Sequence, residues 1–210
     1  MEQKIVTILS AGADAKGIIR PVTVEVEVTN GIGIHLVGLA DAAVKESLLR
    51  TVTALQALDY HIPGKKLIIN IAPPTMYKRG SNYDLPIAIG ILIASGQISV
   101  DSELLNRCVF SGELGLDGTL RTNEDNNGFA IALSAMKDES VKALVTSVDT
   151  AIQAAPLTWI FPYGFDNLAQ IIKVIGDPDG TASDFLIWNR KEWHKIEDAI
   201  DDNRNAEYPL

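Results

Sequence analysis

The sequence predicts a mixed-sheet α/β domain, in which strands and hairpins come first and strand-helix alternation follows. Two segments near the N-terminus alternate apolar with polar residues, which is typical of half-buried antiparallel strands. An Asp-Gly pair at Asp117 and Gly118 is the strongest hairpin signal in the chain. From there to Gly176, short apolar strands alternate with helical patterns. One such domain suits 210 residues of which 47% are hydrophobic.

The first forty residues are expected to form strands. "KIVTIL" and "PVTVEVEVT" both alternate, and "SAGADAKG" between them has the composition of a turn. After "NGIG", the short "IHLVGL" predicts a third strand. The second strand should turn four valines toward a core: Val22, Val24, Val26 and Val28.

A helix follows, with Asp41 as its N-cap. Glu46 and Arg50 are spaced i,i+4 and are expected to face the solvent as a pair. "KKLIINIAPP" is then a strand that is apolar on both faces apart from Asn70, so a central position in the sheet is expected. The apolar face of the helix would consist of Val44, Leu48, Val52, Leu55 and Leu58.

The stretch "MYKRGSNYDLPIAIGILIASG" supports two interpretations. In the first, Ser81 is a nucleophile with Lys78 as its base, but that chemistry needs a lysine kept neutral by burial. In the second, Asp84 caps a buried helix over residues 84–95, with Pro86 in the first turn, where a missing N–H costs nothing. Lys78 stands beside Arg79 in a hydrophilic run, so capping is favoured.

The remaining elements run in a regular order as far as Gly176. They are a short helix "VDSELLNR", a hairpin "CVFSGELGLDGTLRT", a helix "GFAIALSAMK", a strand "VKALVTS", a helix "DTAIQAA", a strand "LTWIFPY" and a closing helix "DNLAQIIKVIG". Residues 1–176 are therefore expected to form one domain. Residues 177–210 are expected to be an acidic linker or tail, with an amphipathic helix that includes Trp188 and Trp193.

Charge and motif content exclude several kinds of site. The net charge is −9, and residues 177–210 hold nine acidic against four basic residues, so the remainder has no basic stripe for binding nucleic acid on its own. No P-loop, C-x-x-C or H-E-x-x-H motif occurs, so no cofactor or metal site is expected in this chain.

The compartment follows from cysteine content and apolar runs. The lone Cys108 fits a reducing compartment. The longest apolar run, residues 85–95, is too short to span a bilayer, and the N-terminus lacks a signal-peptide pattern. A cytoplasmic chain with no membrane contact is expected.

Three segments resemble a known family in combination: "VGLADAAVKES", "DLPIAIGILIASGQI" and "SGELGLDG". They are similar to the N-terminal, magnesium-chelatase-like (ChlI-type) domain of the YifB/ComM family, strongly over residues 31–121 and weakly to about residue 176. That resemblance implies a Lon-protease-like, ribosomal-protein-S5-domain-2-like fold. In the family an AAA+ module follows, which would bind ATP and magnesium and assemble as a hexamer. This chain ends near where that module would start, which suggests a truncated or a stand-alone relative.

The resemblance to Lon also bears on the serine. Laying "KRGSNYDLPIAIG" on the Lon pattern puts Asp84, not Ser81, at the serine position, and the helix expected to carry the lysine is apolar until Lys137. Both members of the Ser-Lys dyad are then absent. Lys78, Arg79 and Asn82 are left as a possible contact loop.

One segment departs from the family. "TNEDNNGF" replaces the usual turn after "LDGTLR", and residues 122–127 are expected to form a surface loop.

The resemblance implies three functions in order of preference. The first is a non-catalytic interaction domain of a YifB/ComM-type AAA+ ATPase, whose motor would drive DNA branch migration outside these residues, with the AAA+ module in cis or in trans. The second is a domain of an ATP-dependent Lon-like serine protease using Ser81. The third is a magnesium-chelatase-like subunit. DNA contact is expected through the motor alone, and the chain itself is not expected to be an enzyme.

Overall fold

The computed structural model describes residues 5–38, 42–74, 76, 81–122, 131, 140–157 and 159–176, with the backbone alone for Ala43. The strands are β1 (Val6–Ala13), β2 (Ile19–Thr29), β3 (Ile34–Val37), β4 (Lys66–Ala72), β5 (Cys108–Phe110), β6 (Glu113–Leu114), β7 (Leu120–Arg121), β8 (Ala143–Ser147) and β9 (Phe161–Phe165). The helices are α1 (Ala42–Ala57), α2 (Asp84–Ala94), α3 (Ser102–Arg107), α5 (Val148–Ala154) and α6 (Leu168–Ile175). The predicted mixed α/β class is confirmed.

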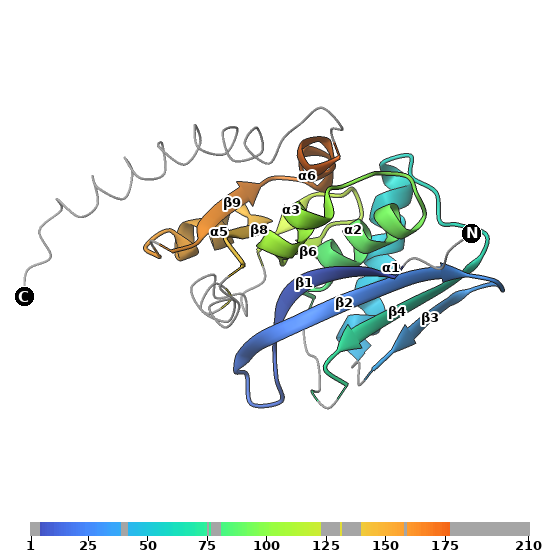
Figure 1. Ribbon diagram of the computed structural model, residues 1–210, viewed down its shortest axis with the longest axis horizontal. Coiled ribbons are helices and arrows are strands. Elements are labelled where there is room, and N and C mark those ends of the chain that lie inside the picture. Colours follow the sequence, from blue (N-terminus) through green and yellow to red (C-terminus); the bar gives the residue numbers. More distant parts are fainter. Residues whose placement is uncertain are drawn as a thin grey trace, which may run out of the picture.

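One sheet of seven strands organises the fold, in the order β3-β4-β2-β1-β5-β8-β9. The pairs β1-β2 and β2-β4 are antiparallel, whereas β3-β4, β1-β5, β5-β8 and β8-β9 are parallel. Strand β1 therefore joins an N-terminal, largely antiparallel half to a parallel half (Figure 1). The hairpin β6-β7 forms a separate two-stranded sheet.

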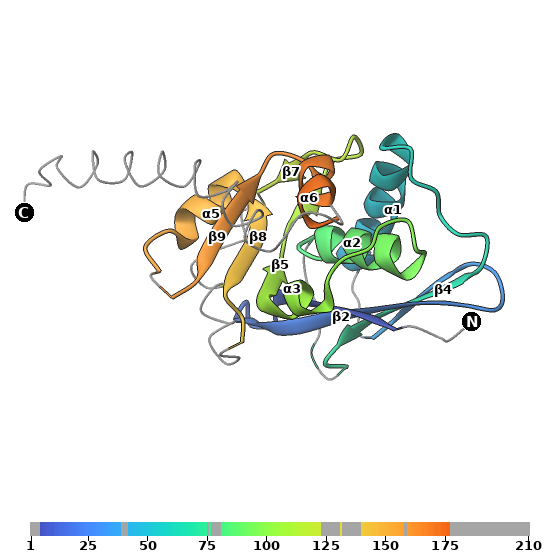
Figure 2. The same cartoon turned by 45° about the horizontal axis from the view of Figure 1, so that its top comes forward.

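The two halves are buried differently. Strand β8 is buried at all five positions, because apolar clusters lie against both of its faces. Strand β4 instead alternates buried with half-buried residues. Figure 2 shows β2 and β4 along the lower margin of the domain, with α2 and α1 above them and no described element below. The half formed by β3, β4 and β2 thus has one open face.

Helix α2 lies at the centre of the larger core. All nine residues from Asp84 to Leu92 are buried in it. A Cβ atom on Gly90 would lie 2.5 Å from Val26 Cγ2, so the glycine allows the helix to pack directly on β2. None of the helices in the described ranges is long and apolar enough to cross a membrane.

Several predicted elements are confirmed. The valines of β2 at positions 22, 24 and 26 are buried and Val28 is partly buried against the same core. The predicted short helix "VDSELLNR" is α3, and the structure adds that Asp101 caps it by accepting a hydrogen bond from the Glu103 amide. The hairpin turns at Asp117 and Gly118, where Gly118 has a φ of 84°.

Other predictions were wrong in extent. The predicted turn "SAGADAKG" is half strand, since β1 continues to Ala13 and the reversal occupies only residues 14–18. Strand β4 is paired on both sides, but it is second from the sheet edge rather than central. Strand β9 begins at Phe161 and extends beyond the predicted "LTWIFPY".

Some predictions fall outside the described residues. They concern Asp41, Lys78, Arg79, Lys137, positions 123–127 of the predicted surface loop, and residues 177–210. Of the predicted helix "GFAIALSAMK" only Ile131 is described, and it is buried in the smaller core.

Candidate functional site

The candidate site is the start of α2, where the sequence placed Ser81, Asn82 and Asp84. All three side chains are buried. The segment is held against the strand β5 and its C-terminal extension, because the Gly112 amide donates to Asn82 O at 3.1 Å and the Leu85 amide donates to Gly112 O at 3.1 Å. The beginning of the helix is therefore part of the core rather than an exposed loop.

Asp84 was expected to cap α2, and the structure corrects this. The N-cap position is Tyr83, which makes no side-chain capping bond, and Asp84 is the first helical residue. Its carboxylate pairs with Arg50 of α1, with 2.9 Å between Arg50 Nε and Asp84 Oδ2. The capping interpretation used only local spacing, whereas the real partner is 34 residues away.

Four donors surround the Asp84 carboxylate. Ser47 Oγ donates to Oδ1, Arg50 donates through Nε and through Nη2 at 3.3 Å, and the Leu114 amide of β6 donates to Oδ2 at 3.0 Å. Thr51 Oγ1 also donates to the main-chain oxygen of Asp84 at 3.3 Å. This arrangement joins α1, α2 and the hairpin β6-β7 through one side chain.

Burial and hydrogen bonding act in opposite directions on Asp84. Burial raises the pKa of the carboxyl above its usual value, and the bonds from Arg50, Ser47 and the Leu114 amide work against that rise. For Arg50, burial favours the neutral form, but the neighbouring Asp84 outweighs this and raises the pKa of the guanidinium. The guanidinium of Arg50 and two further donors, Ser47 Oγ and the Leu114 amide, favour the ionised form of the carboxylate.

The surroundings of Arg50 also differ from the prediction. The sequence places it in a solvent-facing pair with Glu46, but only 22% of its side chain is exposed and its ion pair is with Asp84. A signal for this existed in the sequence. Polar residues Ser47, Arg50 and Thr51 form a stripe at helical spacing beside the apolar face of α1, and an acid opening a wholly apolar helix requires a buried cation.

Ser81 is paired with a carboxylate. Its hydroxyl donates to Glu113 Oε2 of β6. The group that the structure shows beside Ser81 is therefore a carboxylate, whereas the predicted mechanism needs a neutral lysine amine. Glu113 lies opposite Arg121 in the hairpin. Sequence reasoning missed Glu113, since nothing in its local pattern indicates a partner 32 residues earlier.

Asn82 is not on an exposed contact surface. Only 2% of it is accessible, and among the described residues its Oδ1 has no hydrogen-bond partner. It cannot serve as the predicted contact residue without a rearrangement of the loop. The described residues also include no group of three or more His, Cys, Asp or Glu side chains arranged to hold a metal ion.

Comparison with known proteins places these features in a family. Residues 24–152 match the family model described as subunit ChlI of Mg-chelatase. The chain is 43% identical over 102 residues to the uncharacterized protein YifB of Escherichia coli, and 45% identical over 101 residues to the competence protein ComM of Haemophilus influenzae.

These matches cover only parts of the proteins. Each of these two alignments takes in 48% of this chain, but 20% of YifB and 19% of ComM. An uncharacterized protein of Mycobacterium tuberculosis is 34% identical over 151 residues, which are 71% of this chain and 29% of that protein. The ChlI model matches more than half of the length of this chain, and YifB and ComM are among the relatives of the chain. The chain therefore belongs to the ChlI family of magnesium-chelatase-like domains.

Proposed function

We propose that this chain is a non-catalytic interaction domain that works with a YifB/ComM-type AAA+ ATPase module, in cis or in trans. The observation that carries the proposal is the state of the α2 start. The position that resembles the Lon serine is Asp84, whose carboxylate accepts hydrogen bonds from Arg50, Ser47 and the Leu114 amide. A side chain held in this way can neither attack a carbonyl nor accept a proton easily.

Ser81 does not supply the missing chemistry. Its hydroxyl donates to a carboxylate that is not held by a third orienting group in the described part of the chain. The interaction between Ser81 and Glu113 is better explained as a link between the loop before α2 and the hairpin β6-β7. The domain would then offer a rigid surface, while ATP and magnesium would bind in the AAA+ module, which is expected to form a hexamer.

A serine-reactive fluorophosphonate tests the non-catalytic part of the proposal. We expect no labelling of the intact chain and no peptidase activity, with or without Ser81→Ala. Labelling that Ser81→Ala abolishes would instead support the Lon-like protease. Glu113→Gln is the matched variant, since it removes the charge of the carboxylate to which the Ser81 hydroxyl donates.

Addition of the purified ATPase portion of YifB tests the interaction. We expect co-elution with this chain and a changed rate of ATP hydrolysis. DNA binding by the chain alone should be weak, because the chain carries a net charge of −9. The contacts with DNA would be made by the AAA+ module. Tight, salt-sensitive binding of branched DNA by the isolated chain would contradict this division of labour.

A magnesium-chelatase-like subunit is the second candidate, and the description of the matching family model favours it. In that case the chain would bind a chelatase partner rather than a DNA motor. Co-elution with a chelatase ATPase subunit but not with the ATPase portion of YifB would select this alternative.

A further inference from the structure

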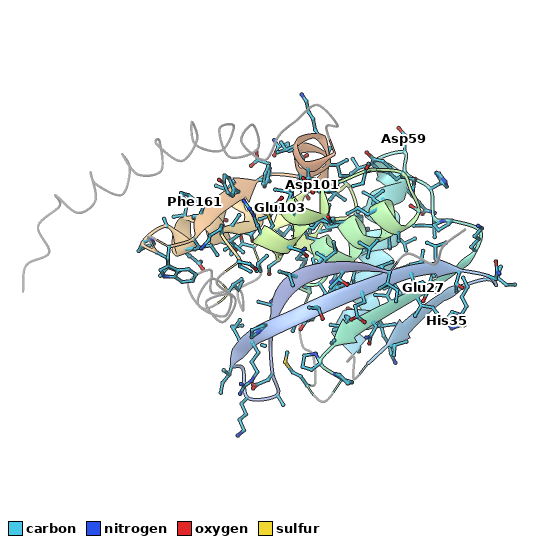
Figure 3. The ribbon with its side chains drawn as sticks, in the orientation of Figure 1. Glu27, His35, Asp59, Asp101, Glu103 and Phe161 are labelled. Atoms are coloured by element: carbon cyan, nitrogen blue, oxygen red, sulfur yellow. The ribbon has the colours of Figure 1, made fainter. Side chains whose placement is uncertain are left out.

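The turn between β2 and β3 contains an asparagine followed directly by a glycine, Asn30 and Gly31. Both residues are exposed. Figure 3 shows Glu27 of β2 and His35 of β3, which precede and follow this turn in the chain, at the same end of the sheet. The amide side chain of Asn30 is therefore at the surface, next to a residue that has no side chain.

The strands hold the chain before and after this pair. Thr29, the last residue of β2, is in register with Lys66 of β4. The Leu67 amide donates to Gly33 O at 2.9 Å, just before β3 begins. Among the described residues, no main-chain oxygen accepts a hydrogen bond from the Gly31 amide. That nitrogen thus lies in a short stretch between two anchored points.

The fold itself requires the glycine. A Cβ atom on Gly31 would lie 3.2 Å from Lys66 Cβ, which is closer than most side chains pack. The φ of Gly31 is 123°, a value that residues with a side chain rarely adopt. The residue after Asn30 is therefore fixed as glycine by the backbone of the turn and by its packing against β4.

This arrangement permits a reaction between the two residues. After losing its proton to solvent, the main-chain nitrogen of Gly31 attacks the side-chain carbonyl carbon of Asn30, and ammonia leaves as a succinimide ring closes. A following side chain would hinder that approach, and glycine has none. Water then opens the ring. Attack at the former side-chain carbonyl gives aspartate, and attack at the main-chain carbonyl gives isoaspartate.

A second pair of this kind shows how the fold can prevent the ring closure. Asp117 and Gly118 form the hairpin turn, where the Gly118 amide donates to Gly115 O at 3.0 Å. The Asp117 carboxylate accepts from Thr119 N at 3.1 Å and from Thr119 Oγ1 at 2.7 Å. Because both the nitrogen and the carboxylate are bound, this pair is protected while the hairpin is folded.

The other asparagines in the described ranges lack at least one of these conditions. Asn82 is buried, and the side chains of Asn70 and Asn167 make hydrogen bonds with neighbouring residues. Asn106 is exposed, but it lies within α3 and precedes an arginine. Exposure and a following glycine coincide only at Asn30 within this set.

We propose that Asn30 is a site of spontaneous deamidation in the folded chain, where isoaspartate and aspartate form. The net reaction consumes one water and releases one ammonia. It adds a negative charge to the turn, and isoaspartate also lengthens the main chain by one carbon atom between β2 and β3. The reaction does not depend on the proposed role as an interaction domain.

The test incubates the full chain at pH 8 and 37 °C and digests samples with trypsin. Residues 17–45 are released as one peptide, because trypsin cuts after Lys16 and Lys45 but not before Pro21. We expect this peptide to gain the mass that replacement of NH2 by OH adds. A methyltransferase specific for isoaspartyl residues should also transfer a labelled methyl group to it from S-adenosylmethionine.

Other pairs of the same kind do not confuse this signal. Those at 127–128 and 179–180 lie outside the described residues. They fall in different tryptic peptides, residues 122–137 and 174–190, so each site is measured separately.

One variant and two internal controls locate the reaction. Asn30→Gln keeps the amide but requires a larger ring, so it should lower the rate at least tenfold. The peptide of residues 80–107, which contains Asn82 and Asn106, should gain no mass. Asp117 should be methylated only after incubation in urea, when its hairpin is unfolded.

Three results would overturn the inference. The first is an unchanged 17–45 peptide in the folded chain when the same peptide of the urea-unfolded chain gains mass. The second is a mass gain in this peptide that Asn30→Gln does not reduce. The third is an equally fast gain in the peptide that contains Asn106.

Discussion

The carboxylate of Asp84 holds α1, α2 and the hairpin β6-β7 together. It is fully buried, and its cationic partner Arg50 is largely covered. Removing one member of such a pair leaves the other charged and buried, which is more costly than the pair is favourable. Stability measurements can therefore separate this interaction from ordinary surface charge.

We predict that Asp84→Asn destabilises the domain by about 2–3 kcal/mol, below the range of about 3–5 kcal/mol for fully buried pairs because water reaches part of Arg50. Urea unfolding followed by circular dichroism measures the change. The double variant Asp84→Leu with Arg50→Met should recover much of the loss. Glu103→Gln, which removes the exposed partner of Arg107, is the control and should have a much smaller effect.

Cys108 provides a second prediction at the scale of one residue. Burial raises the pKa of its thiol to about 12, and the side chain is 1% exposed. At pH 8 an unfolded thiol, with a pKa of about 8.5, is partly ionised, whereas the native one is not. We expect almost no reaction with a disulfide reagent at pH 8 until the chain is unfolded in urea. Rapid native labelling would mean that β5 opens readily.

Single residues also explain where sequence reasoning succeeded and failed. The short helix α3 was predicted, and the Asp101 side chain that begins it makes a local contact, because the capped amide is two residues away. The partner of Asp84 was missed, because the polar stripe of α1 that indicates a buried pair lies 34 residues earlier and only the spacing next to Asp84 was used. The contact between Ser81 and Glu113 was missed for the same reason. The position of the candidate site was therefore predicted, but the partners of its side chains were not.

Helix α2 and the residue before it are packed closely against strands β1 and β2. Its Gly90 lies against Val26 of β2, and on the N-terminal side of the helix Tyr83 lies against Gly12 of β1. A Cβ on Gly12 would come within 1.9 Å of the Tyr83 oxygen, which explains why a strand contains the glycine that made "SAGADAKG" look like a turn. Strand β1 was cut short in the prediction because this packing reason is invisible in the sequence.

We predict that Gly90→Ala destabilises the domain by about 1 kcal/mol or more, although alanine is the better helix former. The added methyl group would meet the Val26 side chain at 2.5 Å. In a Val26→Ala background the same substitution should cost much less, which a double-mutant cycle in urea measures. Gly64→Ala, where the new atom meets nothing within 4 Å, is the control.

At the scale of the whole molecule, the described fold ends with α6. Leu168, Ile171, Ile172 and Ile175 are buried in the larger core, and the Gly176 amide closes the helix on Ile172 O at 2.9 Å. The sequence predicts a domain boundary after Gly176 from the linker composition of "DPDGTASD", and the residues beyond it lie outside the described part of the chain.

We predict that a chain ending at Gly176 unfolds cooperatively at the same urea concentration as the full chain. The reason is that the apolar face of α6 completes the core before that point. Chemical denaturation of both forms under one buffer condition is the measurement. A midpoint lowered by more than the experimental error would show that residues 177–210 contribute to the stability of the domain.

The mixed sheet was predictable as a class, whereas its order was not. Alternation in β2 and the Asp-Gly hairpin are local signals, and both are confirmed. The placement of β1 between β2 and β5 depends on a pairing of Leu9 with Val109, and nothing near either residue specifies it.

The position of β1 has a consequence for synthesis on the ribosome. The hydrogen bond from Ser10 Oγ to Phe110 O spans 100 residues, so one side of β1 has no native neighbour until the chain has grown to β5. At about 5–20 residues per second, this leaves an apolar strand edge uncovered for several seconds. During that interval the uncovered edge of β1 is open to pairing with a wrong strand, even where β2 already covers its other side.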